Sequence, residues 1–169
     1  TKVTLTPLIK YFVEGSWEKP SNGDVVFTHC TSYINLFWLQ SKLSPTFIVP
    51  INEESCNVLT IHSLVYRLLT HNDLRETKKP KQIEKVIKDA RERKRGPVVV
   101  LSEGAPTNGE GLLRFQGFNA KLEKDTKIHV LGFSRPFNGC SPNLTATNGL
   151  AHLIRQLGKF YTKCEVKAA

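Results

Sequence analysis

The sequence predicts an α/β domain with a mixed, mainly parallel sheet covered by helices. Short apolar and β-branched runs, such as VVVL at residues 98–101, alternate with longer segments whose apolar residues recur at helical spacing. A chain that alternates strands with helices favours parallel pairing, because each helix carries the chain back across the sheet. No internal repeat or linker divides the 169 residues, so we expect a single domain spanning residues 1–169.

The first half of the chain predicts strands and one capped helix. Strands are expected at residues 2–6, 9–15, 24–29 and 46–50. The helix is expected at about Tyr33–Leu43, where the hydroxyl of Thr31 or Ser32 can accept a hydrogen bond from a first-turn backbone N–H. Its side chains expected to face the core include Ile34, Phe37 and Trp38.

The second half predicts further helices and strands. One helix is expected across residues 56–71, with its apolar positions at Val58, Ile61, Val65, Leu68 and Leu69. His62 lies in this segment, and we expect it to be partly buried and hydrogen-bonded rather than catalytic. Residues 80–96 predict a surface helix with one packed face: Ile83, Val86, Ile87 and Ala90. Strands at 97–102 and 127–134 follow, and a final helix at 147–161 is expected to turn four side chains inward: Leu150, Leu153, Ile154 and Leu157.

The chain is strongly basic. Its formal net charge is +9 and its sequence pI is near 9.5, which favours anionic partners. Much of the charge lies at residues 75–96. This tract is either a solvated helix face or a patch for anionic lipid headgroups or the phosphates of coenzyme A. Nucleic acid is not expected as a partner, because no aromatic residue is interleaved with these charges.

Neither metals nor a leader sequence are indicated. The four cysteines and five histidines show no metal-ligand spacing, and we expect reduced thiols and no cofactor. No apolar run approaches the roughly 20 residues of a spanning helix, and no signal peptide is visible. Because the chain starts at Thr1 and contains no Met, we expect a fragment of a longer membrane-associated protein whose anchor is absent from this chain.

Two polar clusters follow predicted strands. "HCTSYIN" contains His29, Cys30 and Asn35 after the strand at 24–29, and "SEGAPTNGEGLLRF" contains Glu103 after the strand at 97–102. In open α/β sheets, functional groups collect where the strands end and the helices begin. The sequence therefore predicts a site at one edge of the sheet. Gly104 and Gly109 fit turns with positive φ, and Asn108 with Gly109 is a strong turn dipeptide.

These two clusters resemble motifs of the glycerophospholipid acyltransferase family, over about residues 24–135. The Glu-Gly pair and its spacing to "LLRF" match the family's third block, in which Glu-Gly-Thr-Arg-Ser precedes an apolar segment. The first block is His-x4-Asp. Aligning it on "CTSYIN" places Cys30 at the histidine position and Asn35 at the aspartate position, with His29 one residue early. The chain resembles the fungal and lipid-droplet branches, which also lack the first-block histidine, more than it resembles the bacterial enzymes.

The resemblance implies an acyltransferase-like domain that moves a fatty acyl group from acyl-CoA to a lysophospholipid such as lysophosphatidic acid. His29 or Cys30 would activate the acceptor hydroxyl, while Asn35 and Glu103 would shape the site. Acyl-CoA would be a co-substrate. The resemblance also implies that the third-block loop helps to bind substrate. From that loop and its flanks we expect contributions from Gly104, Thr107, Asn108, Gly109, Arg114 and Arg135.

The departures from the motifs define the alternative. Asn35 is neutral and cannot stabilise an imidazolium as a carboxylate does. Ala105 and Pro106 stand where the family has Thr and the phosphate-binding Arg, so Arg114 and Arg135 are possible substitutes. Glu103 could instead be a structural carboxylate that accepts hydrogen bonds from backbone N–H groups of the loop. Asn35 could likewise have a structural role as a hydrogen-bonding residue of the helix. The alternative is a catalytically degenerate module that binds lipid or a partner protein. Either version would act at an anionic membrane surface, on the cytosolic face of the endoplasmic reticulum or on a lipid droplet.

Overall fold

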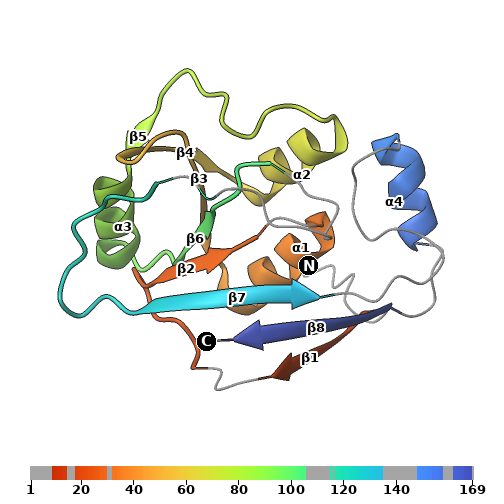
Figure 1. The fold of residues 1–169 in the computed structure, drawn as a ribbon, viewed down its shortest axis with the longest axis horizontal. Helices are drawn as coiled ribbons and strands as arrows, with labels where there is room; N and C mark the ends of the chain where they lie inside the picture. Colours follow the sequence, from red (N-terminus) through yellow and green to blue (C-terminus); the bar gives the residue numbers. More distant parts are fainter. Residues whose placement is uncertain are drawn as a thin grey trace.

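The described residues of the computed structural model, 9–14, 18–29, 32–105, 115, 117–134, 148–157 and 162–168, form an α/β fold (Figure 1). They contain four helices and a mixed sheet of seven strands plus the two-residue β5. The strands are β1 (Ile9–Glu14), β2 (Val25–Thr28), β3 (Thr46–Pro50), β4 (Ser55–Leu59), β5 (Lys81–Gln82), β6 (Val98–Leu101), β7 (Ile128–Ser134) and β8 (Thr162–Ala168). The helices are α1 (Tyr33–Leu43), α2 (Ile61–Leu69), α3 (Ile83–Glu92) and α4 (Gly149–Leu157).

The centre of the sheet is parallel. The strand order is β1-β8-β7-β2-β6-β3-β4-β5, and β2 pairs in parallel with both β6 and β7. The β3–β6 and β1–β8 pairs are also parallel, whereas β3–β4, β4–β5 and β7–β8 are antiparallel. The predicted mixed α/β sheet is therefore confirmed, and its central strands end at the same edge.

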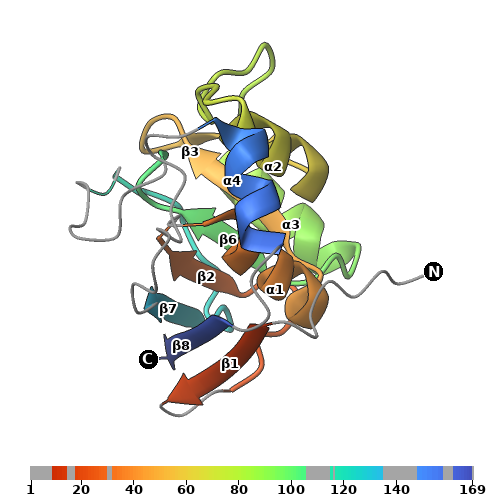
Figure 2. The same cartoon turned by 90° about the vertical axis from the view of Figure 1, so that its right-hand side faces the viewer.

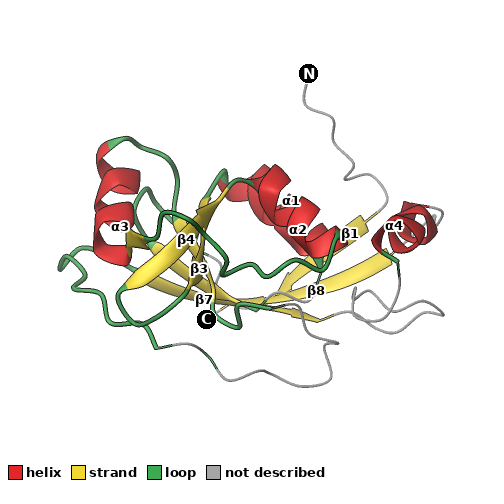
Figure 3. Ribbon diagram, turned by 90° about the horizontal axis from the view of Figure 1, so that it is seen from above, coloured by secondary structure: helices red, strands yellow, loops and turns green. Residues whose placement is uncertain are grey.

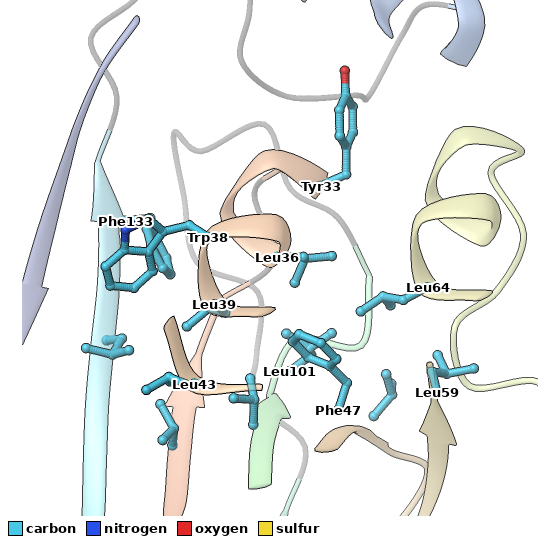
Figure 4. Close-up of a cluster of buried hydrophobic side chains, with 14 of the residues drawn as sticks. Tyr33, Leu36, Trp38, Leu39, Leu43, Phe47, Leu59, Leu64, Leu101 and Phe133 are labelled. Atoms are coloured by element: carbon cyan, nitrogen blue, oxygen red, sulfur yellow. The ribbon is translucent and has the colours of Figure 1, made fainter. Parts of the chain in front are cut away.

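The sheet is buried on both faces at β6. Alternate residues of a strand point to opposite faces. Val99 and Leu101 accordingly pack with α1 and α2 in one apolar cluster, while Val98 and Val100 pack with α3 in another. Figure 4 shows part of the first cluster, in which Leu36 and Leu39 of α1 approach Leu101 and Phe47. Figure 3 shows α1 and α2 beside each other above the sheet.

α1 lies where the sequence predicts it. Ser32 is the N-cap, and its hydroxyl accepts a hydrogen bond from the backbone N–H of Ile34 at 3.3 Å. Ser44 ends the helix in the left-handed conformation, at φ 47°. The prediction that Phe37 is a core residue is wrong, because it lies beside the buried stripe of the helix and is 38 % exposed.

The predicted helix at residues 56–71 is in fact a strand followed by a helix. β4 ends at Leu59, and Thr60 caps α2 by accepting a hydrogen bond from the N–H of Ser63 at 3.3 Å. Val58 is therefore a strand residue that pairs with Ile48 of β3. His62 lies on the solvent side of α2 and is exposed, so the expected partial burial is wrong.

The C-terminal region differs most from prediction. Leu150 and Ile154 of α4 are 65 % and 62 % exposed, so the prediction that they face inward is wrong, and the side chains of Leu153 and Leu157 lie outside the described set. Gly149 instead packs against the backbone of Leu69, which leaves no room for a Cβ and fixes the rotation of the helix. β8 was not predicted, and the expected strand at 2–6 lies outside the described residues.

The surface helix α3 buries the four predicted residues, Ile83, Val86, Ile87 and Ala90. Its outer face is charged and contains the pairs Lys88–Glu92 and Arg93–Asp89. Among the described helices, none combines the length and apolar character that a bilayer span requires.

Candidate functional site

The two polar clusters follow neighbouring parallel strands. In the register of β2 and β6, Thr28 lies opposite Leu101, so His29 and Ser102 are the first residues beyond the paired ends. The pairing continues one step further, because the N–H of Ser102 donates to the carbonyl of Thr28 at 3.3 Å. Chain segments more than seventy residues apart in sequence thus begin side by side at the carboxyl edge of the sheet.

α1 directs its N-terminus to this edge. Asn35 lies in the first turn, is only 2 % exposed, and donates its backbone N–H to the carbonyl of Ser32 at 3.1 Å. A helix N-terminus carries partial positive charge and favours anions or developing negative charge nearby. The first turn therefore contributes a buried amide side chain and a favourable dipole to the edge where β2 ends.

His29 is half-buried and turned toward β7. Its Nε2 lies 3.0 Å from the carbonyl oxygen of Phe133, and its ring meets the Phe133 ring edge-on at a centroid distance of 6.2 Å. A carbonyl only accepts, so Nε2 donates this hydrogen bond, and in the neutral ring Nδ1 is left as the basic nitrogen. Because β2 separates β7 from β6, Nε2 faces away from the strand that leads to Glu103.

Glu103 is buried at the end of β6. The residue is 1 % exposed, and the turn that contains it closes through the N–H of Gly104 to the carbonyl of Leu101 at 3.2 Å. Gly104 has φ +66°, as expected for a turn glycine. A Cβ at Gly104 would lie 2.5 Å from Nε of Arg75, so glycine also lets the guanidinium approach the turn.

Arg75 was not predicted as a site residue, yet it contacts this turn directly. Its Nη2 donates to the carbonyl of Glu103 at 3.1 Å, and its side chain is half-buried. Within the described part of the chain, its buried Nε has no hydrogen-bond partner. The signal in the sequence was the basic tract 75–96, of which Arg75 is the first residue, but nothing in the tract indicated which cation approaches Glu103.

The segment that carries Arg75 is firmly anchored. Leu74 is buried in the core at 1 % exposure, and Nδ2 of Asn57 donates to its carbonyl at 2.8 Å. Arg67 of α2 donates to the carbonyls of Asp73 and Glu76 at 2.6 and 2.8 Å. The fixed backbone positions the guanidinium of Arg75. Further cations follow it on exposed positions: Lys78, Lys79 and Lys81.

A second polar pair lies beside α1. Tyr33 and His152 of α4 are 2 % and 3 % exposed, and the Tyr33 hydroxyl lies 3.2 Å from Nδ1 of His152. Figure 4 shows the Tyr33 side chain directed away from the sheet. This contact holds α4 against the start of α1.

A third polar cluster lies at the opposite end of β2. The buried carboxylate of Asp24 accepts hydrogen bonds from the N–H of Ser21 at 2.7 Å and of Lys127 at 3.1 Å. His129 Nε2 lies 3.7 Å from the same carboxylate. This cluster joins the amino ends of β2 and β7 and plays a structural role there.

The described residues cover part of the predicted site. They place His29, Asn35, Glu103 and Gly104 at or next to the carboxyl ends of β2 and β6. The other predicted site residues lie outside the described set: Cys30, Thr107, Asn108, Gly109, Arg114 and Arg135. Within the described residues, no group of three His, Cys, Asp or Glu side chains could hold a metal ion.

Comparisons with protein-family models, with curated proteins and with solved structures gave no match. The family resemblance drawn from the motifs therefore stays a prediction.

Proposed function

We propose that the domain is an acyltransferase that moves a fatty acyl group from acyl-CoA to a lysophospholipid such as lysophosphatidic acid, with an acyltransferase-like fold. The observation that carries the proposal is the parallel pairing of β2 with β6, which sets His29 and Glu103 at neighbouring strand ends. The N-terminus of α1 and the cation of Arg75 add positive potential, which suits a phosphate-bearing acceptor and a reaction that develops negative charge.

The reaction needs one base and no metal ligand. Nδ1 of His29 would take the proton of the acceptor hydroxyl as its oxygen attacks the thioester carbonyl. The tetrahedral intermediate then collapses, the C–S bond breaks, and the imidazolium returns the proton to the departing coenzyme A thiolate. The Nε2 hydrogen bond to the Phe133 carbonyl supports this tautomer, because it fixes the ring and leaves Nδ1 basic. Cys30 is the alternative base.

The remaining residues would bind and orient the substrate. Asn35 and Glu103 are both buried, and their contribution would be to shape the site. Arg75 would pair with the acceptor phosphate, since guanidinium matches phosphate with two parallel hydrogen bonds. Arg114 and Arg135 complete the expected phosphate contacts, while Gly104, Thr107, Asn108 and Gly109 would form the substrate loop.

A second candidate is a degenerate acyltransferase-like module that binds lipid or a partner protein at the endoplasmic reticulum or a lipid droplet. One observation favours it: the only hydrogen bond that the described residues give the His29 ring goes to a backbone carbonyl. A carbonyl stabilises an imidazolium less well than a carboxylate does, and Asn35 stands where the motif has its carboxylate.

Labelled oleoyl-CoA and lysophosphatidic acid, given to the protein in membranes, separate the two candidates. Transfer that is lost in His29→Ala/Cys30→Ser/Glu103→Gln, but kept in the exposed control His62→Ala/Glu92→Gln, supports the enzyme and its site. Transfer that survives the triple replacement contradicts the site assignment. Saturable lysophospholipid binding without transfer in the wild type favours the binding module.

A further inference from the structure

We propose that α4 docks the domain onto an anionic phospholipid surface through Leu150 and Ile154. This inference deepens the membrane association in the proposed function and rests on it, but its test contains no acyl-CoA and no acceptor. Figure 2 looks onto α4, which lies on the outside of the molecule. The docking face, defined as the side of α4 that bears Leu150 and Ile154, points away from the core.

The apolar residues of the docking face are exposed because the opposite side of α4 packs against the rest of the domain. Gly149 packs on the backbone of Leu69, and His152 is buried against Tyr33. Leu150 and Ile154, four residues apart, therefore share the outer side, at 65 % and 62 % exposure. An ordinary surface helix buries its apolar residues and exposes its polar ones. These three residues of α4 show the reverse, because His152 is buried while Leu150 and Ile154 are exposed.

The charge of the chain segment that contains α4 fits an anionic surface. Arg155, the helix's only charged residue, is exposed. In the sequence, no carboxylate occurs from Arg135 to Cys164, while four cations do: Arg135, Arg155, Lys159 and Lys163. Apolar side chains beside cations, without acidic residues, are the composition of segments that lie on anionic bilayers.

A second copy of the chain fits the docking face less well than a bilayer does, and the other exposed apolar pair fits an anionic bilayer less well than α4 does. A second copy of this chain would need an interface of about 20–30 residues a side for a stable dimer, and the docking face offers two apolar side chains. The other exposed apolar pair, Ile128 and Val130 on β7, lies in a different charge environment. Lys127 is paired there with Glu18, and β7 runs beside β8, whose Glu165 lies opposite Ser134.

Flotation with vesicles tests the proposal. The probes are vesicles of phosphatidylcholine alone and of phosphatidylcholine with about one third phosphatidylserine. Wild-type protein is expected to bind the anionic vesicles in a salt-sensitive way. Leu150→Glu/Ile154→Glu is expected to bind them about tenfold more weakly or worse. Ile128→Glu/Val130→Glu makes the same charge change at similarly exposed positions, and it is expected to bind like the wild type.

Three results would overturn the proposal. The first is a wild-type protein that does not float with anionic vesicles. The second is an equal loss in both double variants, since that would reflect charge alone. The third is concentration-dependent dimerisation abolished by the α4 variant, which would identify a second copy as the occupant. If circular dichroism shows that the glutamate variant unfolds, Leu150→Ser/Ile154→Ser replaces it, with the same weaker binding expected. Acyl transfer to detergent-dispersed acceptor is measured separately, so a catalytic failure is not confused with a docking failure.

Discussion

Arg75 contacts the turn after β6, whose own sequence contains no cation. Its guanidinium rests on Gly104 and donates to the carbonyl of Glu103 at 3.1 Å. The third-block loop has Ala105 and Pro106 where the resembled family has its phosphate-binding arginine. A cation from the segment after α2 can therefore serve the same edge of the sheet.

Under the proposed function, Arg75→Gln is expected to raise KM for lysophosphatidic acid about tenfold or more with little change in kcat. The reason is that a charge-assisted contact to phosphate is lost in ground and transition states alike. Arg93→Gln is the matched control, because it removes the same charge from the exposed face of α3. Steady-state kinetics with varied acceptor concentration measures this change. An unchanged KM in Arg75→Gln would show that Arg75 does not bind the acceptor.

Cys56 is a buried thiol with a clear pH consequence. It lies in β4 at 0 % exposure, and burial raises its pKa to about 11 from the ordinary 9.0, with Lys81 opposing the shift. The thiolate therefore forms more readily in the unfolded chain. The thiol's contribution to stability is complete below pH 9.0 and is lost as the pH rises toward 11.

Urea unfolding at about pH 8 and about pH 11 tests this shift. The wild type is expected to lose roughly 2–3 kcal/mol more of its free energy of unfolding across this range than Cys56→Ala does. The comparison cancels the other titrating groups, which the two proteins share. An equal loss in both proteins would show that Cys56 does not titrate differently on folding.

At the scale of elements, the sequence predicted those with clear local signals. α1 was predicted from Tyr33 to Leu43 because Ser32 can cap it and its apolar spacing is helical. The boundary between β4 and α2 was missed, although Thr60 is the cap that marks it, because the apolar residues of both elements form one helix-like pattern. β8 was missed because its sequence, TKCEVKA, contains few apolar residues. Among its described side chains, Val166 and Ala168 contact the core.

The rotation of α4 could not be predicted from periodicity. Its four large apolar residues share one side, so their spacing predicts that this side is inward, whereas Leu150 and Ile154 of that side are exposed in the structure. Two long-range contacts decide the rotation, Gly149 with Leu69 and His152 with Tyr33, and neither has a local signature. The same contacts expose Leu150 and Ile154.

Tyr33→Phe tests this attachment of α4. The variant removes the hydroxyl that lies 3.2 Å from His152 Nδ1, and it is expected to lower the free energy of unfolding by about 1–2 kcal/mol. Amide hydrogen exchange in α4 should quicken more than in α3, because the lost contact holds α4 directly. Tyr66→Phe removes a hydroxyl from a residue that is 63 % exposed and should change neither quantity. Equal effects of the two variants would contradict a holding role for Tyr33.

At the scale of the whole molecule, the sheet order creates the candidate site. The sequence predicted polar clusters after the strands at 24–29 and 97–102, and the principle of carboxyl-end sites predicted that they could meet. Only the structure shows that β2 and β6 are direct neighbours in parallel register. Side-chain direction was beyond prediction, since the His29 ring is oriented by the Phe133 carbonyl, 104 residues away in sequence.

The distribution of charge also depends on the whole fold. Part of the basic tract is neutralised on α3, where Asp89 meets both Arg93 and Arg95. Arg75, at the beginning of the tract, instead reaches the turn after β6. The charge of the basic tract is thus divided between a solvated helix and the edge that carries the candidate site.

Under the proposed function, the neighbouring ends of β2 and β6 carry out acyl transfer. The most direct measurement is the initial rate of labelled phosphatidic acid formation from oleoyl-CoA and lysophosphatidic acid, compared between the wild type and His29→Ala/Cys30→Ser. We expect measurable transfer by the wild type, a fall of about 100-fold or more in the double variant, and no change in His62→Ala. A double variant that turns over at the wild-type rate would contradict it.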